Sequence, residues 1–228
     1  MRPIHPLRLL AVTACASVAL AAGCSSMSGG GGHPMGFFIT SSNPGQGGNL
    51  GGLAGADAHC QRLADSVGAG GRTWRAYLST VAVGGAEAVN ARDRIGSGPW
   101  VNAKGVTVAT SVADLHSPDA RLGKDTSLTE KGEVVSGYGD AVNRHDILTG
   151  SRPDGTVSVP APGQDTTCGN WTRGDGGSAI VGHHDHRGTH PDPVANASWN
   201  SSHGTRGCSL PQLAQSGSAG LLYCFAAK

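Results

Sequence analysis

The chain has 228 residues, and its 17 Lys and Arg residues nearly balance its 16 Asp and Glu residues, giving a formal net charge of +1. This balance excludes the strongly basic surface on which nucleic-acid binding depends. Charged residues make up 14% of the chain, against about 25% in ordinary soluble domains, and glycine is abundant at 37 residues. The composition therefore predicts a loop-rich domain with short regular elements.

The first residues have the pattern of a secretory signal peptide. A basic start precedes an apolar stretch that ends at Ala22 and is too short for a comfortable transmembrane span. "LAAGC" resembles the bacterial lipobox, in which the cysteine is lipidated and becomes the new N-terminus, although Ala21 stands where leucine is usual. We expect residues 1–23 to be a lipoprotein signal peptide and Cys24 to be the lipid attachment site. The alternative is an ordinary signal peptide with an incidental cysteine.

A stretch rich in glycine and serine, residues 24–36, follows and has no apolar periodicity. It is typical of a flexible tether, with a reach of roughly 20 Å. Because Ser25 and Ser26 follow the cysteine without an aspartate, we expect the lipid to anchor the chain in the outer membrane of a two-membrane cell envelope. Residues 37–228 remain, which is enough for one domain with a core of its own.

The first half of this domain has the clearest patterns. Phe37–Thr40 is apolar and predicts a short strand. Apolar residues at spacings of three and four from Leu53 to Val67 predict an amphipathic helix with Cys60 on its buried face. Alternation over residues 73–80 predicts a half-buried strand, and residues 84–96 predict a second, shorter helix.

Regular elements are sparser in the second half. Residues 105–110 predict a strand, and residues 111–167 have little periodicity and indicate loops with short strands. Two further strands are predicted at residues 177–182 and 220–226. The order of strand, helix, strand, helix and terminal strands is that of an α+β fold.

Six cysteines occur in the chain. Cys15 would leave with the signal peptide and Cys24 would carry lipid, so four would remain in an exported domain, which argues for two disulfides. Those four, which allow three pairings, are Cys60, Cys168, Cys208 and Cys224. The sequence has no CxxC pair, which disfavours a zinc knuckle or a thioredoxin-type centre.

Four stretches of the domain are recognisable as a group: "GGNLGGLAGADAHCQRLADSVGAGGRTWRAYLST", "ARDRIGSGPWVNAKG", "TCGNW" and "CSLPQLAQSGSAGLLYCFA". They resemble the endostatin domain at the C-terminus of certain collagens, and its bacterial relatives. The resemblance covers about residues 37–228, with two insertions. It implies a C-type-lectin-like fold with nested disulfides, Cys60–Cys224 and Cys168–Cys208.

The known binding sites of that family are not matched in this chain. Zinc-binding endostatins use histidines at the first strand and a later aspartate, where this chain has Phe37 and Gly105. Heparin-binding members have two arginines where this chain has Gly51 and Ala54. The EPN and QPD tripeptides of calcium-dependent lectins are absent from the sequence. The resemblance therefore implies a binding domain without identifying its ligand.

A histidine-rich loop, "GHHDHRGTHPD" at residues 182–192, is the candidate metal site. Zinc needs three or four nitrogen, sulfur or oxygen ligands that converge on one point. In an extended chain, His184 and His186 would project to one side, and His183 and Asp185 to the other. The ligand that could complete one of these pairs is His190, Asp192 or His203. Two interpretations remain, a zinc site and a solvated loop, and short motifs of this kind more often mark the second.

The sequence contains none of the motifs HExxH, GxSxG, GxGxxG or a P-loop, so we expect no enzymatic activity. Trp199, Asn200 and His203 are candidate ligand-binding residues, because lectin-like folds usually bind ligands in the span between the second pair of cysteines. We expect an envelope-anchored lipoprotein that binds a glycan or a protein partner. The alternatives are a metal-dependent envelope enzyme that uses the His183–His186 loop, and a purely structural envelope protein.

Overall fold

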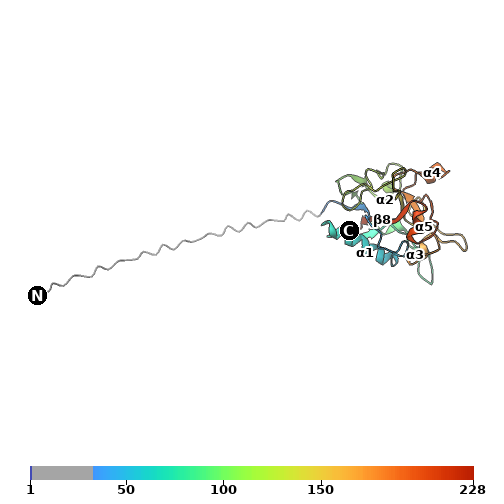
Figure 1. Cartoon of the computed structure of the whole chain (residues 1–228), viewed down its shortest axis with the longest axis horizontal. Coiled ribbons are helices and arrows are strands. Elements are labelled where there is room, and N and C mark those ends of the chain that lie inside the picture. The colour runs from blue at the N-terminus through green and yellow to red at the C-terminus, as the bar shows by residue number, and fades with distance from the viewer. Residues whose placement is uncertain (2–32) are drawn as a thin grey trace. The chain divides into compact units, whose positions relative to one another are not determined.

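A computed structural model of the chain describes Met1 and residues 33–228. The expected signal peptide beyond Met1, the lipid attachment site at Cys24 and the tether as far as residue 32 lie outside the described residues. The folded part is a mixed α+β domain with short strands and few helices (Figure 1). Among the described residues, no helix has both the length and the apolar character needed to cross a bilayer.

A six-stranded sheet is organised around β8 (Ser218–Ala226). β8 pairs antiparallel with β1 (Phe37–Ile39) and β2 (Trp74–Ala76), and parallel with β5 (Asp146–Leu148). β6 (Ile180–His183) pairs antiparallel with β5, and β7 (His203–Gly204) pairs antiparallel with β6. A separate two-stranded sheet joins β3 (Trp100–Val101) to β4 (Thr107–Ala109).

The helices are short apart from α1 (Gly52–Ser66), which has 15 residues and matches the amphipathic helix predicted from Leu53 to Val67. The others are single turns: α2 (Val112–Leu115), α3 (Cys168–Trp171), α4 (Pro193–Asn196) and α5 (Leu210–Ala214). α3 is a left-handed turn, because all four of its residues have positive φ, between 47° and 66°. Such a turn is costly for residues other than glycine, and the disulfide at its first residue holds it in place.

Side chains of β8 alternate between two hydrophobic cores. Leu222 and Cys224 pack with α1 in one core, whereas Tyr223 and Phe225 pack with Leu115 of α2 in the other. Figure 1 shows β8 in the middle of the folded part, with α1 and α2 on opposite sides of it. Successive side chains of a strand face opposite sides of the sheet. Burial on both faces explains why "GLLYCFA" is apolar almost throughout.

Two disulfides crosslink these elements. Cys60 of α1 is bonded to Cys224 of β8, and Cys168 is bonded to Cys208. This is the nested pairing that the sequence resemblance implies. The first bond ties the long helix to the central strand, and the second closes the span that contains β6, α4 and β7.

The helix predicted at residues 84–96 is wrong. The chain forms a tight hairpin there, with backbone bridges between Val83 and Ala86 and between Thr80 and Val89. Gly84 and Gly85 at its tip have φ values of 59° and 83°. A two-residue hairpin turn requires such left-handed values, which glycine adopts at little cost. A short 3-10 turn, Ala91–Asp93, follows the hairpin.

The folded domain also begins earlier than expected. Met35 and Gly36, which we assigned to the tether, are both buried. The amide of Gly36 donates a hydrogen bond of 2.7 Å to the carbonyl of Val101. These two residues therefore belong to the core rather than to a flexible linker.

Candidate metal centre

Three neighbouring strands bring Asp146, His183 and His203 to one face of the sheet. Asp146 begins β5 and lies directly opposite His183 at the end of β6. His203 begins β7 and lies opposite Val181, two residues before His183 on β6. Paired residues, and residues two apart on one strand, face the same side of a sheet. His145 joins the group from the residue that precedes β5.

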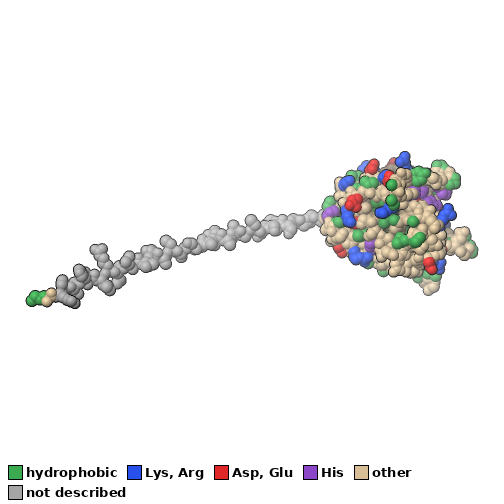
Figure 2. Space-filling model, in the orientation of Figure 1, with side chains coloured by type: hydrophobic (Ala, Val, Ile, Leu, Met, Phe, Trp, Pro, Cys, Tyr) green, Lys and Arg blue, Asp and Glu red, His purple; other side chains and the backbone are tan. Residues whose placement is uncertain are grey.

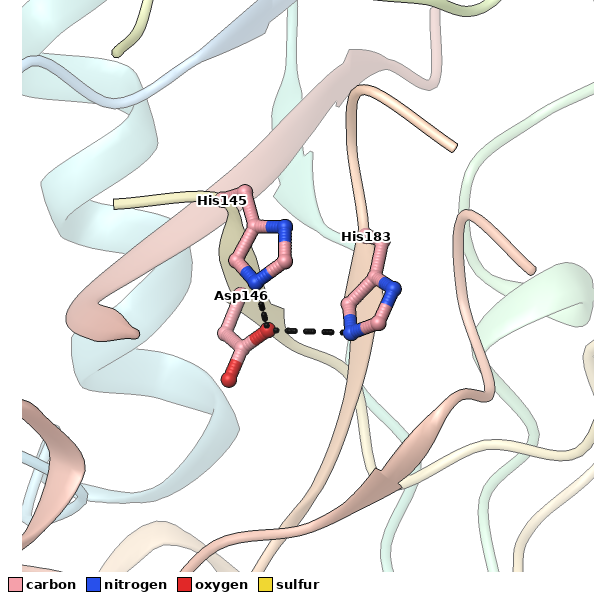
Figure 3. A group of neighbouring side chains, drawn as sticks. All are labelled: His145, Asp146 and His183. Carbon is pink, nitrogen blue, oxygen red and sulfur yellow. Dashed lines mark ion pairs between the residues drawn. The ribbon is translucent and has the colours of Figure 1, made fainter. Parts of the chain in front are cut away.

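One carboxylate is the centre of this group. The Oδ1 atom of Asp146 lies 3.2 Å from Nε2 of His145 and 3.3 Å from Nε2 of His183. Figure 3 shows both imidazole rings pointing a nitrogen at this same oxygen. On the other side of the carboxylate, Oδ2 lies 3.5 Å from Nε2 of His203. The rings of His145 and His183 are stacked, with centroids 4.2 Å apart.

The carboxylate of Asp146 is fully buried and poorly satisfied. Its side chain has no exposed surface, and neither of its oxygens accepts a hydrogen bond from the described part of the chain. Burial raises the pKa of Asp146 to about 7, against the opposing effects of the nearby His145 and of the Ser216 hydroxyl, which does not reach hydrogen-bond geometry with the carboxylate. Buried polar atoms without a partner are rare in folded proteins and call for a physical explanation.

The Nδ1 atom of each of these histidines contacts an oxygen that accepts hydrogen bonds and cannot donate them. The oxygen belongs either to an ionised carboxylate or to a backbone carbonyl. Nδ1 of His145 lies 3.2 Å from Oδ1 of Asp185, and Nδ1 of His183 lies 2.7 Å from the carbonyl oxygen of Asn196. Nδ1 of His203 lies 3.2 Å from the carbonyl oxygen of Gly204. Each Nδ1 therefore carries a proton, and in a neutral ring the Nε2 lone pair faces Asp146. Metal-binding histidines are commonly held in this way.

The charge states of the three rings differ. Burial lowers the pKa of His183 to about 4 and also lowers the pKa of His203, so both rings are neutral near pH 7. Burial opposes the charged form of His145 too, but the hydrogen bond to Asp185 and the charge of Asp146 outweigh it, and the pKa of His145 is raised. A metal ion would therefore have to displace a proton from His145.

The spacing of these atoms suits a small transition-metal ion. Zinc binds imidazole nitrogen and carboxylate oxygen at about 2.0–2.2 Å, so neighbouring ligands in a tetrahedral site lie about 3.4 Å apart. The nitrogen–oxygen distances around Asp146 are 3.2, 3.3 and 3.5 Å. One ligand atom each from His145, Asp146 and His183 lies within 4.8 Å of the other two. Two histidines and one carboxylate are a common ligand set for metal sites that keep an open position.

A pocket of about 650 Å³ gives this group its access to solvent. His145, His183 and His203 line the pocket, whereas Asp146 does not and is fully buried. An ion held by these residues would have protein on the Asp146 side and the pocket on the other. Figure 2 shows histidine side chains reaching the surface beside the position of α4 in Figure 1.

The histidine-rich loop is not extended, so the predicted alternation of its side chains is wrong. β6 ends at His183, and the chain then turns, with a φ of 56° at His186. Asp185 lies behind His145 and holds its ring. His184 is fully buried with Nε2 3.4 Å from the carbonyl oxygen of Ser136, and Nδ1 has no partner among the described residues. His186 contacts the carbonyl oxygens of Ala197 and Leu122.

The structure therefore separates the four predicted metal ligands. Within the described residues, His183 belongs to the clustered group and Asp185 supports it, whereas His184 and His186 point elsewhere. Of the three residues named as distant ligands, His203 lies at the site, His190 lines the pocket, and Asp192 caps the start of α4.

Trp199 and Asn200 are packing residues, which corrects their assignment as ligand contacts. Trp199 is 6% exposed, and its ring packs against Tyr77 and Tyr223. Asn200 is 1% exposed, and its Nδ2 donates to Tyr77 Oη and to the neighbouring carbonyls of Arg152 and Pro153, which share one hydrogen. Neither side chain can reach a ligand on the surface. Of the three predicted contacts, His203 lines the pocket.

Sequence reasoning missed His145 and Asp146. Both lie in "NRHDILTG", inside the stretch of residues 111–167 that has little periodicity. The adjacent His-Asp pair directly before a short apolar run was the available signal. It could not be weighed, because nothing local shows that this run pairs with β6.

Comparison with known proteins does not assign the chain to a family. No family model matches the chain, and no curated protein is significantly similar to it.

Proposed function

We propose that this chain is a metal-dependent binding domain. It holds a divalent ion of the zinc class with Nε2 of His145, Nε2 of His183 and the carboxylate of Asp146. The observation that carries the proposal is the buried Asp146 carboxylate, which faces imidazole nitrogens and accepts no hydrogen bond from the described residues.

The chemistry of the group favours a cation at its centre. With Nδ1 acting as the donor, the neutral rings of His183 and His203 turn Nε2 lone pairs toward the carboxylate of Asp146, and His145 would do the same once it loses a proton. Burying an ionised carboxylate without compensation costs several kcal/mol. The hydroxyl of Ser202 lies 3.1 Å from Nε2 of His183. It can donate a hydrogen bond to this ring, but it provides no donor for the carboxylate. A divalent ion would satisfy the carboxylate and both nitrogens together.

The fourth coordination position faces the pocket. His203 borders that side, and its side chain is 26% exposed, against 2% for His183. The position is open to an external ligand that enters from solvent, because His203 contacts the other carboxylate oxygen of Asp146. We propose that the pocket is the ligand-binding site of the domain and that the ion is one of its contacts.

We further propose the cell envelope as the setting and a C-type-lectin-like domain of the endostatin type as the scaffold. The signal peptide and lipobox patterns of residues 1–24 support the first part. The pairing of β1 with β8, the nested disulfides and a pocket partly within the span from Cys168 to Cys208 support the second. A lipid-anchored domain of this kind would bind a glycan or a protein partner.

Metal content tests the central proposal. Purified protein that is loaded with Zn²⁺ and dialysed should retain about one ion, and metal at 100 times its Kd should add about 2.7 kcal/mol to the free energy of unfolding. Asp146→Asn should lose the bound ion. Asp119→Asn, the same change at an exposed carboxylate, is the matched control and should behave as wild type. No retained metal, or equal retention in both variants, would refute the proposal.

A metal-dependent hydrolase is the second candidate, because a ligand set of two histidines and a carboxylate with an open side is also that of catalytic zinc. Hydrolysis of 4-nitrophenyl acetate by the metal-loaded protein, compared with Asp146→Asn, separates the two. A binding domain should give equal rates in both proteins.

A further inference from the structure

We infer that the pocket beside the metal centre binds a small oxyanion, a carboxylate or phosphate group, with one oxygen on the ion and another on Arg206. The inference rests on the metal-dependent binding proposed above and specifies the chemistry of the ligand.

The charge of the pocket lining points to an anion. Arg206 and His190 line the pocket together with His145, His183 and His203. Among the described residues that line it, none is an aspartate or a glutamate. Asp146 and Asp185, the two carboxylates nearest the ion, are both committed to the centre itself and lie outside the lining. With a divalent ion bound, the accessible surface of this pocket is positive, which attracts anions.

Arg206 is available for a ligand and sits on a fixed backbone. Its side chain makes no ion pair or hydrogen bond with the described part of the chain, and the residue is exposed. The residues around it are anchored: the amide of Thr205 donates to the carbonyl of Ala179, and Cys208 is in a disulfide. The guanidinium group is therefore free to contact a ligand in the pocket that Arg206 lines.

A neutral donor also lines the pocket. Oδ1 of Asn143 accepts a hydrogen bond from the amide of His145. This contact fixes which end of the side-chain amide is free, and Nδ2, a donor, is the end that remains. Asn143 lines the pocket, so it offers the ligand a third contact that suits an oxygen acceptor.

Oxyanions match this set of contacts better than neutral sugars do. A carboxylate or a phosphate presents two or more oxygens on one atom, so one oxygen can bind the ion while a second accepts from the planar guanidinium fork. A sugar hydroxyl carries no charge and gains less from either partner. An acidic sugar, a peptide carboxylate or a phosphorylated headgroup would all present the required group.

Cobalt provides a visible probe of the open coordination position. The full protein is loaded with Co²⁺ in a non-coordinating buffer and titrated separately with sodium acetate, inorganic phosphate and the neutral sugar methyl glucoside. Either anion should change the visible absorption of the cobalt in a saturable way, and the sugar should not. Arg206→Gln should raise the half-saturating anion concentration about tenfold, the loss of one charge-assisted hydrogen bond. Arg187→Gln, an exposed arginine of the neighbouring loop that does not line the pocket, is the control and should change nothing.

The outcomes distinguish this inference from the proposal beneath it. A response to acetate alone identifies a carboxylate ligand, a response to phosphate alone identifies a phosphate ligand, and both support the inference. If cobalt binds but no anion changes its spectrum, or if the two arginine variants are affected equally, the inference is wrong and the metal site stands. If no cobalt binds, the proposed function fails and the inference fails with it.

Discussion

Two polar clusters of the domain that contain histidine differ in how their donors and acceptors are matched. In one, Tyr77 Oη lies 2.7 Å from Nε2 of His116 and accepts from Nδ2 of Asn200. Nδ1 of His116 contacts the carbonyl oxygen of Val112. Every group in that chain of contacts has a partner of the opposite kind, so the cluster is complete without a ligand.

The second cluster is the group of His145, Asp146, His183 and His203, and it has a surplus of acceptors. Its carboxylate accepts no hydrogen bond from the described residues, although three ring nitrogens lie within 3.5 Å of it. Both clusters contain histidine, and both are largely buried with one partly exposed ring, so burial and residue type do not separate them. The balance of donors and acceptors does separate them: the first cluster is matched internally, and the mismatch in the second is what supports the proposed metal site.

Removing one ring from the second cluster should have the largest effect. The free energy of zinc binding, about 10–16 kcal/mol in four-ligand sites, corresponds to about 2.5–4 kcal/mol for each ligand. His183→Ala should therefore weaken metal binding by about 100-fold to 1000-fold, measured by competition with a chromophoric chelator. An affinity within threefold of wild type, in a variant with an unchanged near-UV circular dichroism spectrum, would remove His183 from the site.

A smaller loss of affinity should follow when the support behind a ligand is changed. Asp185 lies 3.2 Å from Nδ1 of His145 and also accepts from the amide of Tyr138. Hydrogen-bonding partners of metal ligands typically contribute 10-fold to 100-fold to affinity, so Asp185→Asn should weaken metal binding by about that factor. The same chelator competition measures it. A loss as large as that of His183→Ala would mean that Asp185 is itself a ligand.

A substitution in the first cluster should lower the free energy of unfolding and leave the affinity for metal unchanged. Tyr77→Phe leaves Nε2 of His116 without its donor, whereas Asn200 keeps the carbonyls of Arg152 and Pro153 as partners. Leaving this partly buried acceptor without a donor should lower the free energy of unfolding by about 1–2 kcal/mol. Urea titration measures this loss, and the zinc affinity of the variant should equal that of wild type. A change in zinc affinity would contradict the separation of the two clusters.

An element of this fold could be predicted from the sequence where the pattern that specifies it lies within the element itself. The apolar spacing of α1 and the apolar run of β8 are local, and both elements form as predicted. The hairpin at Val83–Ala86 was also locally encoded, because Gly84-Gly85 is a hairpin-turn signal that outweighs the weak helical pattern around it. β5 has three residues and is stabilised by its neighbours β6 and β8, so no local pattern marks it.

The same distinction explains the site. His183 and His203 were recognisable as candidates because histidine is a ligand type wherever it stands. Asp146 becomes a partner of His183 only through the pairing of β5 with β6, which depends on the tertiary structure. Trp199 was misassigned for the corresponding reason: nothing near it in the sequence indicates that Tyr77 and Tyr223 cover its ring.

The smallest expected effect concerns the proton on Tyr77. Burial raises the pKa of Tyr77 above its ordinary value of 10, against the hydrogen bonds from neighbouring side chains. The unfolded chain therefore releases this proton above about pH 10 while the folded protein keeps it, so this contribution to stability is complete below pH 10 and is lost as the pH rises. One tyrosine can account for at most about 1.4 kcal/mol for each pH unit. Urea titrations at pH 9, 10 and 11 should give a shallower fall in stability for Tyr77→Phe than for wild type. Tyr223, whose pKa burial also raises, remains in both proteins, so the difference between them isolates Tyr77. Equal slopes would mean that Tyr77 exchanges its proton with solvent and that the first cluster is more open than its hydrogen bonds indicate.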